Sequence, residues 1–259
     1  MPELPEVEAY RALAEGVLDR RVRSVQVGDD RFVASVSPRQ LRRALAGRRF
    51  TDARRIGKLL VLDADDGIRL GLRFGMTGRL LVDGVAGVDR LVYSSDRDER
   101  AWDRFGLRFD DGSTLVVRDP RLLGSVTLDP DEGTLGPDAL ALDGPSLHAA
   151  LGASTAPLKA RIMDQARIAG IGNLLADEIL CAAALAPTRP AGSLTAPERR
   201  RLLRHIGRTV ELCMARGGSH SGDLYPERHP GGHCPRCGAE LRRDRVGGRT
   251  TWWCPSHQR

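Results

Sequence analysis

The hydrophobic pattern divides this chain into an N-terminal helix, a long stretch of short strands and a second half made mainly of helices. The first apolar residues with helical spacing are Val7, Tyr10, Leu13 and Val17. Pro5 is a favourable first helical residue, so we expect this helix to begin near it. A strand is indicated by Val22, Val25 and Val27. Ser37-Pro38 then opens a short helix that Gly47 can close.

Between Phe50 and Leu128 the pattern changes to short apolar runs separated by turn signals, including DDG at 65–67 and at 110–112. The expected strands are Leu59–Asp63, Ile68–Phe74, Arg79–Val82, Leu107–Phe109 and Ser113–Val117. This pattern predicts a β-sandwich or flattened barrel with the first helix beside it, and residues 1–128 form the predicted N-terminal domain.

A stretch rich in acidic residues, Pro and Gly follows at residues 129–145, and we interpret it as a linker. Beyond it the expected helices are Ser146–Leu151, Ala156–Ile168, Asn173–Leu185 and Ala196–Arg216. Residues 217–232 have no regular pattern and are expected to form a polar loop, which ends a helical domain of residues 146–232. Residues 233–259 form a further small domain. The predicted fold class is therefore α+β.

The composition is that of a globular protein with an aliphatic core, because 41% of the 259 residues are apolar and only 4% are aromatic. Glu3, Glu6 and Glu8 stand where a signal peptide has its basic region, so we expect no signal peptide and a cytoplasmic location. The net charge of +6 favours a polyanionic partner, and solvated surface arginine is the alternative. Only Lys58 and Lys159 among the 40 basic residues are lysine, whose compact ammonium differs from a guanidinium.

Pro2 is the first candidate for chemistry. If Met1 is removed, which the small following residue permits, Pro2 carries a free secondary amine. A generic α-amino group has a pKa near ~8, against ~10.4 for lysine, so more of it is neutral at pH 7 and able to attack an aldehyde. The product is an iminium, which withdraws electrons. Glu3 places a carboxylate beside this amine. A proline without a chemical role is the alternative at this point.

The spacing of four C-terminal residues predicts a zinc site. The ligands of this site are Cys234, Cys237, Cys254 and His257. Their CxxC-x16-CxxH pattern is typical of a tetrahedral Zn²⁺ site between two hairpin knuckles, and a disulfide is a poorer explanation in the cytoplasm. His229 and His233 are substitutes if His257 points away. Cys181 and Cys213 lie in helical apolar patterns and are expected to be core thiols.

Two further segments favour contact with phosphate. The segment between Cys237 and Cys254, which we call the finger hairpin, has four arginines at its tip: Arg242, Arg243, Arg245 and Arg249. A basic tip most often binds a phosphate backbone, with a merely solvated tip as the alternative. The sequence AGIGN at 169–173 makes a tight turn into a helix, where backbone N–H groups and the helix dipole can hold a phosphate. Glycine-rich connections of this kind also occur for packing alone.

These motifs occur in an order that is highly specific, although each alone is not. PELPE, a GKLL hairpin, GMTG, DPR, GIGN before a helix and a C-terminal zinc finger follow one another over essentially the whole chain. In this combination the chain resembles the formamidopyrimidine-DNA glycosylase and endonuclease VIII family. The resemblance implies a two-sheet β-sandwich, a helical domain with a helix-two-turn-helix and a zinc finger, with double-stranded DNA bound in the cleft between the domains.

The resemblance also implies a reaction of base excision repair. Such enzymes flip a damaged nucleotide out of the duplex, because its C1′ is unreachable in the stack. Pro2 would attack C1′, the base would depart, and the iminium would allow β- and then δ-elimination at the flanking phosphates. Glu3 would protonate the sugar ring oxygen, and Glu6 would support the site. Lys58, at the hairpin tip after Gly57, would reach the target phosphates and base.

The resemblance places DNA contacts on both halves of the chain. Lys159 and Asn173 match phosphate-contacting positions of the helical domain, and Arg249 matches the finger arginine that grips the phosphates around the flipped nucleotide. The hole that the flipped base leaves would be filled by Met76, Arg121 and Leu123. One Zn²⁺ per chain would be structural.

Three departures from the family pattern bear on the substrate and the metal. Leu123 stands where formamidopyrimidine glycosylases usually have phenylalanine, so it stacks less on a base. The loop 217–232 is short for the segment that caps an oxidised purine in that branch. His257 replaces the usual fourth cysteine, which Zn²⁺ tolerates. We therefore expect a preference for ring-opened purines, hydantoins or oxidised pyrimidines over 8-oxoguanine.

Two other functions share some of these features. Small tautomerases use an N-terminal proline as a base, but those chains have no reason to carry a zinc finger or an arginine-rich face. A DNA-damage recognition protein of the same fold with weak catalysis is the second alternative, and the presence of Pro2, Glu3 and Lys58 argues against it. A single chain carries both a zinc finger and a helical motif with which to bind a duplex. We therefore expect a monomer that is associated with the nucleoid.

Overall fold

The computed structural model describes residues 2–88, 91, 92, 94, 95, 97 and 99–259, and the chain divides into two compact units. The first unit contains Pro2 and Glu6–Glu132, and the second contains Glu3–Pro5 and Gly133–Arg259. The boundary after Glu132 falls inside the predicted linker. Among the described residues, none of the helices has the length and the apolar character that a membrane span requires.

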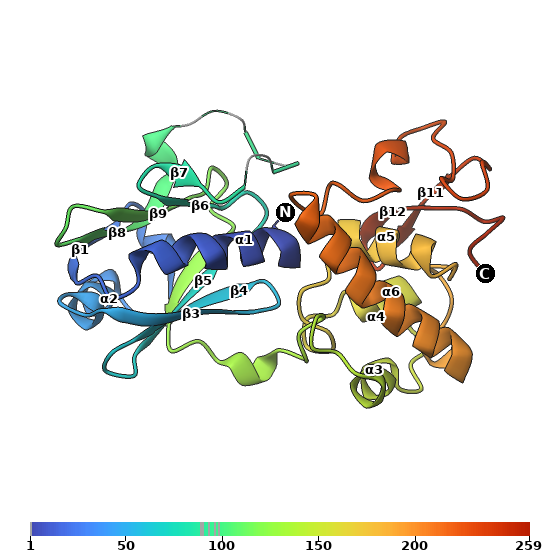
Figure 1. Ribbon diagram of the computed structural model, residues 1–259, viewed down its shortest axis with the longest axis horizontal. Helices are drawn as coiled ribbons and strands as arrows, with labels where there is room; N and C mark the ends of the chain where they lie inside the picture. The colour runs from blue at the N-terminus through green and yellow to red at the C-terminus, as the bar shows by residue number, and fades with distance from the viewer. Residues whose placement is uncertain (1, 89–90, 93, 96, 98) are drawn as a thin grey trace. The chain divides into compact units, whose positions relative to one another are not determined.

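Two five-stranded sheets make up the first unit (Figure 1). One sheet has the order β1-β8-β9-β6-β7, with bounds Val22–Val27, Asp103–Phe109, Thr114–Arg118, Arg79–Val82 and Val85–Ala86. The other has the order β2-β10-β5-β4-β3, with bounds Val33–Ala34, Ser125–Leu128, Arg69–Arg73, Leu59–Ala64 and Phe50–Ile56. Within the described residues the neighbouring strands are antiparallel, except for the parallel pair β2 and β10.

Helix α1 (Leu4–Ala14) packs into the core of the first unit, as its apolar spacing predicts. Val7 and Tyr10 are fully buried in one cluster with residues of both sheets. The Tyr10 ring lies 4.5 Å from the Phe74 ring, centroid to centroid, and its hydroxyl donates to the carbonyl oxygen of Gly78 at 3.1 Å. Phe74 and Gly78 are the first and last residues of the loop between β5 and β6, so helix α1 contacts both ends of that loop.

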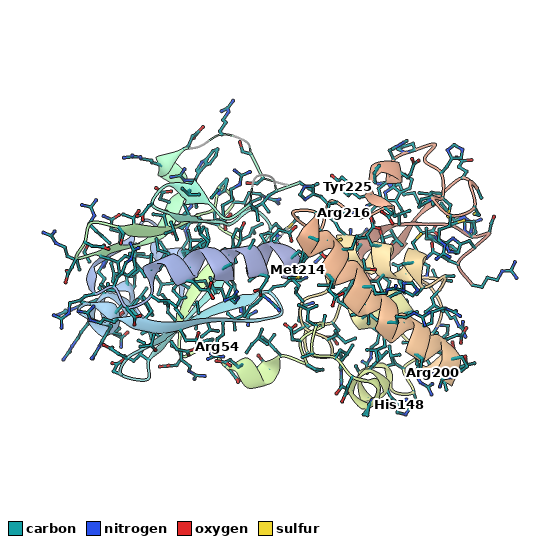
Figure 2. All side chains as sticks on the ribbon, in the orientation of Figure 1. Arg54, His148, Arg200, Met214, Arg216 and Tyr225 are labelled. Carbon is teal, nitrogen blue, oxygen red and sulfur yellow. The ribbon has the colours of Figure 1, made fainter. Side chains whose placement is uncertain are left out.

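Helix α2 (Pro38–Leu45) begins as its sequence predicts. The Ser37 hydroxyl accepts the N–H of Gln40, and the Gln40 side chain accepts the N–H of Ser37, which is a complete capping box. At the other end of this unit, Glu132 accepts hydrogen bonds from Arg54, labelled in Figure 2, and from Arg69. These ion pairs attach the beginning of the predicted linker to strands β3 and β5.

The second unit is built on four helices, α3 (Gly144–Leu151), α4 (Leu158–Ile162), α5 (Asn173–Ala182) and α6 (Ala196–Ala215). Helix α5 contacts α6 and strand β12, and its residues are buried over most of its length. Leu4 belongs to the same apolar cluster as Leu175 and Ile179 of this helix.

Short 3-10 helices occur in both units and cover Glu15–Val17, Asp30–Phe32, Arg100–Trp102, Glu132–Thr134, Ala191–Ser193 and Tyr225–Glu227.

A two-stranded hairpin ends the chain, with β11 (Arg242–Val246) and β12 (Arg249–Trp253) in antiparallel register. Gly247 and Gly248 form its two-residue turn and both have positive φ, +57° and +75°, which is the backbone of a type I′ turn. Trp252 packs in a small apolar cluster with Cys181 and Leu224. The finger hairpin thus rests on helix α5 and on the loop that follows α6.

The α+β fold class is confirmed, and one helix prediction is wrong. We expected a helix over Ala156–Ile168, but α4 ends at Ile162. The Asp164 carboxylate accepts the N–H of Ala166 at 3.0 Å, and the Gln165 amide donates to the carbonyl oxygens of Met163 and Ile171, both at 2.8 Å. Side chains therefore satisfy backbone groups that a longer helix would have used.

Candidate active site

The carboxylate of Glu3 caps the N-terminus of helix α5. Glu3 is 1% exposed, and its two oxygens accept the backbone N–H groups of Gly172 at 2.9 Å, Leu174 at 2.9 Å and Leu175 at 3.1 Å. The first N–H groups of a helix have no partner within the helix, and the helix dipole favours an anion at this end. The sequence provides that anion from the residue that follows Pro2.

This contact corrects our interpretation of the AGIGN turn. Three of the N–H groups expected to hold a phosphate at or just after this turn are occupied by the Glu3 carboxylate. The N–H of Gly170 is also satisfied, by the side-chain oxygen of Gln165 at 3.0 Å. Asn173 opens α5, and its Oδ1 is buried without a hydrogen-bond partner among the described residues. The Asn173 side chain thus remains a candidate phosphate-binding group at this turn.

Gly172 is required by the close approach of Glu3. A Cβ at this position would lie 2.2 Å from the carboxyl carbon of Glu3 and 2.3 Å from Oε1. Its φ of −117° is accessible to any residue, so the constraint is the space alone. The glycine of the GIGN motif is thus explained by an internal carboxylate.

Lys58 lies at the tip of the β3–β4 hairpin, as predicted. Strand pairing ends on either side of Gly57 and Lys58, and Gly57 has a φ of +59°. A positive φ at the first of two turn residues is the geometry of a type II′ turn, which favours glycine there. The Arg55 guanidinium donates to Glu8 at 2.8 Å and to the carbonyl oxygen of Gly57 at 3.2 Å. These bonds brace the turn that carries the lysine.

Pro2 and Glu6 are both buried in the first unit. Glu6 is 2% exposed and lies in the first turn of α1. Both residues are therefore packed inside the protein rather than exposed to solvent.

Met76, Arg121 and Leu123, which are predicted to fill the place of the flipped base, lie on two neighbouring loops of the first unit. A Cβ at Gly75 would lie 2.4 Å from the carbonyl of Leu123, so the loop that carries Met76 touches the loop that carries Arg121 and Leu123. Leu123 is 47% exposed and Arg121 is exposed, whereas Met76 is half-buried. Met76 is thus no fully buried core methionine, and Leu123 presents an apolar side chain to solvent.

Lys159 lies in a fully buried position in the second unit. Its Nζ is 2.7 Å from Oδ1 of Asp177 and donates to Oγ1 of Thr251 at 2.8 Å and to the carbonyl oxygen of Thr250 at 3.2 Å. Burial lowers the pKa of the Lys159 ammonium, and the Asp177 carboxylate opposes that shift. Arg228 pairs with the same carboxylate. The ammonium therefore links the helices to strand β12, and it has no exposed surface from which to make the expected phosphate contact directly.

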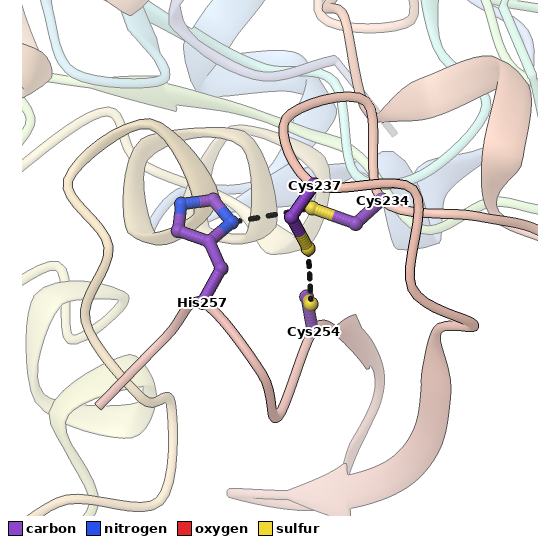
Figure 3. Close-up of side chains that lie close together, drawn as sticks. All are labelled: Cys234, Cys237, Cys254 and His257. Carbon is purple, nitrogen blue, oxygen red and sulfur yellow. Dashed lines mark hydrogen bonds between the residues drawn. The ribbon is translucent and has the colours of Figure 1, made fainter.

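The four predicted metal ligands form one group (Figure 3). Their ligand atoms all lie within 4.8 Å of one another, with 3.4 Å between the sulfurs of Cys237 and Cys254 and 3.2 Å between the sulfur of Cys234 and Nδ1 of His257. A tetrahedral metal with Zn–S and Zn–N bonds of ordinary length needs separations of about 3.6–3.8 Å, so both pairs would have to open by a few tenths of an ångström around the ion. His257 faces this group, so the substitutes His229 and His233 are not needed for a complete donor set.

The two remaining cysteines are core thiols, as expected. Cys181 is 4% exposed and Cys213 is fully buried. Burial raises the pKa of the Cys181 thiol well above its ordinary value, so the thiol stays protonated and unreactive. The described residues thus provide a donor set of three cysteines and one histidine that can hold a metal ion, and Cys181 lies outside it.

Glu178 anchors the loop 217–232. Its Oε2 accepts the N–H of Leu224 at 3.0 Å, and Gly222 packs so closely that a Cβ there would lie 2.1 Å from the Glu178 carboxyl carbon. Burial raises the pKa of Glu178 to about 7. Arg216, labelled in Figure 2, pairs with Asp223 at 2.7 Å and holds the beginning of the loop. The loop is thus fixed to α5 and α6.

Sequence reasoning missed several residues that organise these sites. Asp177 and Glu178 are adjacent acidic residues inside an apolar helical period, which was a usable signal for buried carboxylates. Gln165 carried no such signal, because a single glutamine does not mark which nearby backbone groups its side chain will bind.

Family models match both halves of the chain. The formamidopyrimidine-DNA glycosylase N-terminal domain matches residues 1–126, and the formamidopyrimidine-DNA glycosylase H2TH domain matches residues 135–223. Proteins named formamidopyrimidine-DNA glycosylase from Methylococcus capsulatus and Laribacter hongkongensis are 34% and 33% identical, with 100% of each chain covered. The alignment with the Methylococcus protein, at 283 residues, is longer than this chain, so that relative contains residues that this chain lacks.

Solved structures with the same fold include complexes with DNA. The Lactococcus lactis protein bound to DNA with an abasic site matches with a TM-score of 0.83 and 25% identity over 99% of both chains. The same protein bound to Fapy-dG-containing DNA matches with a TM-score of 0.84 and 25% identity over 99% of both chains.

Gly172→Ala tests the contact between Glu3 and helix α5. The added methyl group overlaps the Glu3 carboxyl group, so we expect the free energy of unfolding to fall by about 1–3 kcal/mol, the usual cost of overpacking. Gly207→Ala is the matched control, because nothing lies within 4 Å of a Cβ at that helical position. It should raise the stability by about 0.5–1 kcal/mol. Denaturant unfolding measures both, and equal stability of the wild type and Gly172→Ala would contradict the contact.

Glu178→Gln tests the buried carboxyl group. The Glu178 pKa rises from 4.5 to about 7 on folding, so between these values the unfolded chain binds fewer protons and stability falls as the pH rises. Glu178→Gln should lack this loss and gain on the order of 3 kcal/mol relative to wild type between pH 5 and 8. Glu211→Gln, the same change at an exposed position of α6, should keep the wild-type slope. Parallel slopes for wild type and Glu178→Gln would refute the assignment.

Proposed function

This chain belongs to the formamidopyrimidine-DNA glycosylase family, the DNA glycosylases of base excision repair, and we propose that it excises damaged bases through the amine of Pro2. The observation that carries the proposal is the fixed position of Glu3. Its carboxylate is held by three backbone N–H groups, so the residue next to Pro2 cannot shift. After loss of Met1, a nucleophilic amine would stand beside this fixed residue.

The proposed reaction begins with attack of the neutral Pro2 nitrogen on C1′ of a flipped nucleotide. The bond between C1′ and the base breaks, and the base leaves with the bonding electrons and takes up a proton. Opening of the sugar ring gives an iminium between Pro2 and C1′, which acidifies the proton on C2′. Loss of that proton expels the 3′ phosphate, and a second elimination expels the 5′ phosphate. Hydrolysis then frees the amine.

The proton transfers fall to Glu3. An amine that forms an iminium needs a nearby group that gives a proton to the ring oxygen and later accepts one. Glu6 is buried on the first turn of α1, which suits a supporting role. Lys58 stands on a braced turn, where its ammonium can reach phosphate oxygens as a point charge.

The proposed DNA contacts are Asn173 and Arg249 for phosphates and Met76, Arg121 and Leu123 for the vacated position in the stack. Arg249 is exposed at the start of β12, next to the turn of the finger hairpin. Lys159 is enclosed by its partners, so we propose that it serves DNA binding indirectly by holding the strand that carries Arg249. The partner is a damaged duplex, bound by a monomer at the nucleoid in the cytoplasm.

The substrate preference rests on two features of this chain. Leu123 offers an apolar wedge without an aromatic face, and the loop 217–232 is short and tied to Glu178 and Arg216. A tied loop has little length left to fold over an oxidised purine. We therefore propose a preference for ring-opened purines, hydantoins or oxidised pyrimidines over 8-oxoguanine.

Single-turnover excision from matched duplexes tests this function. Each duplex carries one lesion at the same position: a ring-opened purine, a hydantoin, an oxidised pyrimidine or 8-oxoguanine. We expect the first three to be excised faster than 8-oxoguanine by about tenfold or more, the effect of roughly 1.4 kcal/mol in transition-state binding. Fast and selective removal of 8-oxoguanine would overturn the preference. Tight binding without excision of any lesion would instead support the damage-recognition alternative.

We propose that the metal held by the three cysteines and His257 is one structural Zn²⁺ per chain. The donor set of three sulfurs and one imidazole nitrogen is a closed tetrahedral set that leaves no open position for catalysis. The ion would join the two knuckles and so hold the finger hairpin.

Metal content by mass spectrometry tests the zinc proposal. Wild type should contain one zinc per chain, His257→Cys should keep it because sets of four cysteines also bind Zn²⁺, and His257→Ala should lose most of it. Cys213→Ala is the control, since this fully buried thiol lies outside the group and in a different apolar cluster, and should leave the content unchanged. Full zinc in His257→Ala, or another metal in the wild type, would contradict the assignment.

A further inference from the structure

Two loops of the first unit cross from one sheet to the other beside each other. Loop 74–78 joins β5 to β6, and loop 119–124 joins β9 to β10. At one end of the crossing Arg73 pairs with Ser125, and at the other end Arg79 pairs with Arg118. The strand ladders therefore fix both ends of both loops, and only the middles depend on contacts of their own.

The carboxylate of Asp119 joins the middles of the two loops. Asp119 is fully buried. Its Oδ1 accepts the Thr77 hydroxyl at 2.5 Å, which is the bond across to loop 74–78. Within its own loop the carboxylate accepts the N–H groups of Arg121 at 3.2 Å, Leu123 at 2.8 Å and Gly124 at 2.8 Å.

Two residues near this carboxylate have backbone conformations with positive φ. Leu122 has a φ of +54°, which a leucine adopts only when its surroundings hold it there. Gly75 has a φ of +56° and lies where any Cβ would collide with Leu123. Leu123 itself is exposed by 47%, so the strained loop presents an apolar side chain outward.

We propose that Asp119 is a positioning residue that joins Met76, Arg121 and Leu123 into one rigid wedge. The proposal rests on the proposed function, in which these side chains fill the place of a flipped nucleotide. Side chains inserted into a base stack must resist the tendency of the stack to close, and separate flexible loops would yield. The bond between Asp119 and Thr77 makes the two loops move together.

Thr77→Val is the sharpest test, because it keeps the side-chain volume and removes the hydrogen bond that the Thr77 hydroxyl donates across to Asp119. Thr77→Ser is the matched control and keeps the hydroxyl. Excision of a ring-opened purine from duplex DNA should slow about tenfold or more in Thr77→Val, the effect of losing one hydrogen bond to a charged group, and recover in Thr77→Ser. Cleavage of a single-stranded oligonucleotide with an abasic site needs no wedge and should stay at the wild-type rate in both variants.

The two substrates separate the possible outcomes. Equal losses on duplex and single strand in Thr77→Val would show a merely structural role, and unchanged duplex excision would show that the bond does not matter; either result overturns the inference. Asp119→Asn gives a second break in the same network, with the same expectation, if Thr77→Val does not fold. A wild type inactive on both substrates would instead refute the proposed function.

Discussion

The contact between the Glu3 carboxylate and the first N–H groups of helix α5 is the constraint on which the proposed site depends. A carboxylate that leaves water must be compensated, and here the dipole and the unpaired donors of a helix end do so. Leu4 adds a backbone bond to Gly170 at 3.2 Å, so the chain after Pro2 is held by both its side chains and its backbone. An N-terminal segment normally moves freely. These bonds remove that freedom next to Pro2, the residue that is proposed to react.

A second buried charge network holds the finger. Asp177 is shared by Lys159 and Arg228, and the Lys159 ammonium satisfies three acceptors in a position without solvent exposure. A compact ammonium with three donors fits this site, whereas a planar guanidinium would need more room. In a chain whose only other lysine is Lys58, this geometry explains why position 159 is lysine and not arginine. Removing one partner of such a network would leave a buried charge uncompensated.

Much of the fold could be predicted because its signals are local. Helical spacing, the Ser37 capping box, the Gly57-Lys58 turn and the Cys and His spacing each depend on residues near one another in the chain. The end of α4 at Ile162 was missed although its cause is also local: the side chains of Asp164 and Gln165 bind backbone groups within six residues of themselves, and apolar spacing does not report such bonds. The two-residue strands β2 and β7 carry too few residues for a period to be visible.

The site divides along the same line. The group of metal ligands was predicted from residue spacing, whereas Pro2 was proposed from the chemistry of its amine and Lys58 from the family resemblance. The partner of the GIGN turn was missed, because the anion that it binds is an internal side chain from the other end of the sequence. Asp119 was present in the DPR motif, but its bond to Thr77 was missed, because these two residues become neighbours only when the two loops lie beside each other. Long-range contacts of polar side chains leave no periodic trace in a sequence.

Trapping with borohydride tests the central claim most directly. The protein, confirmed by mass to lack Met1, is mixed with a duplex containing one abasic site, reduced and separated on a denaturing gel. Iminium formation at Pro2 predicts a covalent protein–DNA band in the wild type whose cross-link maps to residue 2, and the band should disappear when the α-amine of Pro2 is blocked by acetylation. No band in the wild type, with duplex binding intact, would contradict the account.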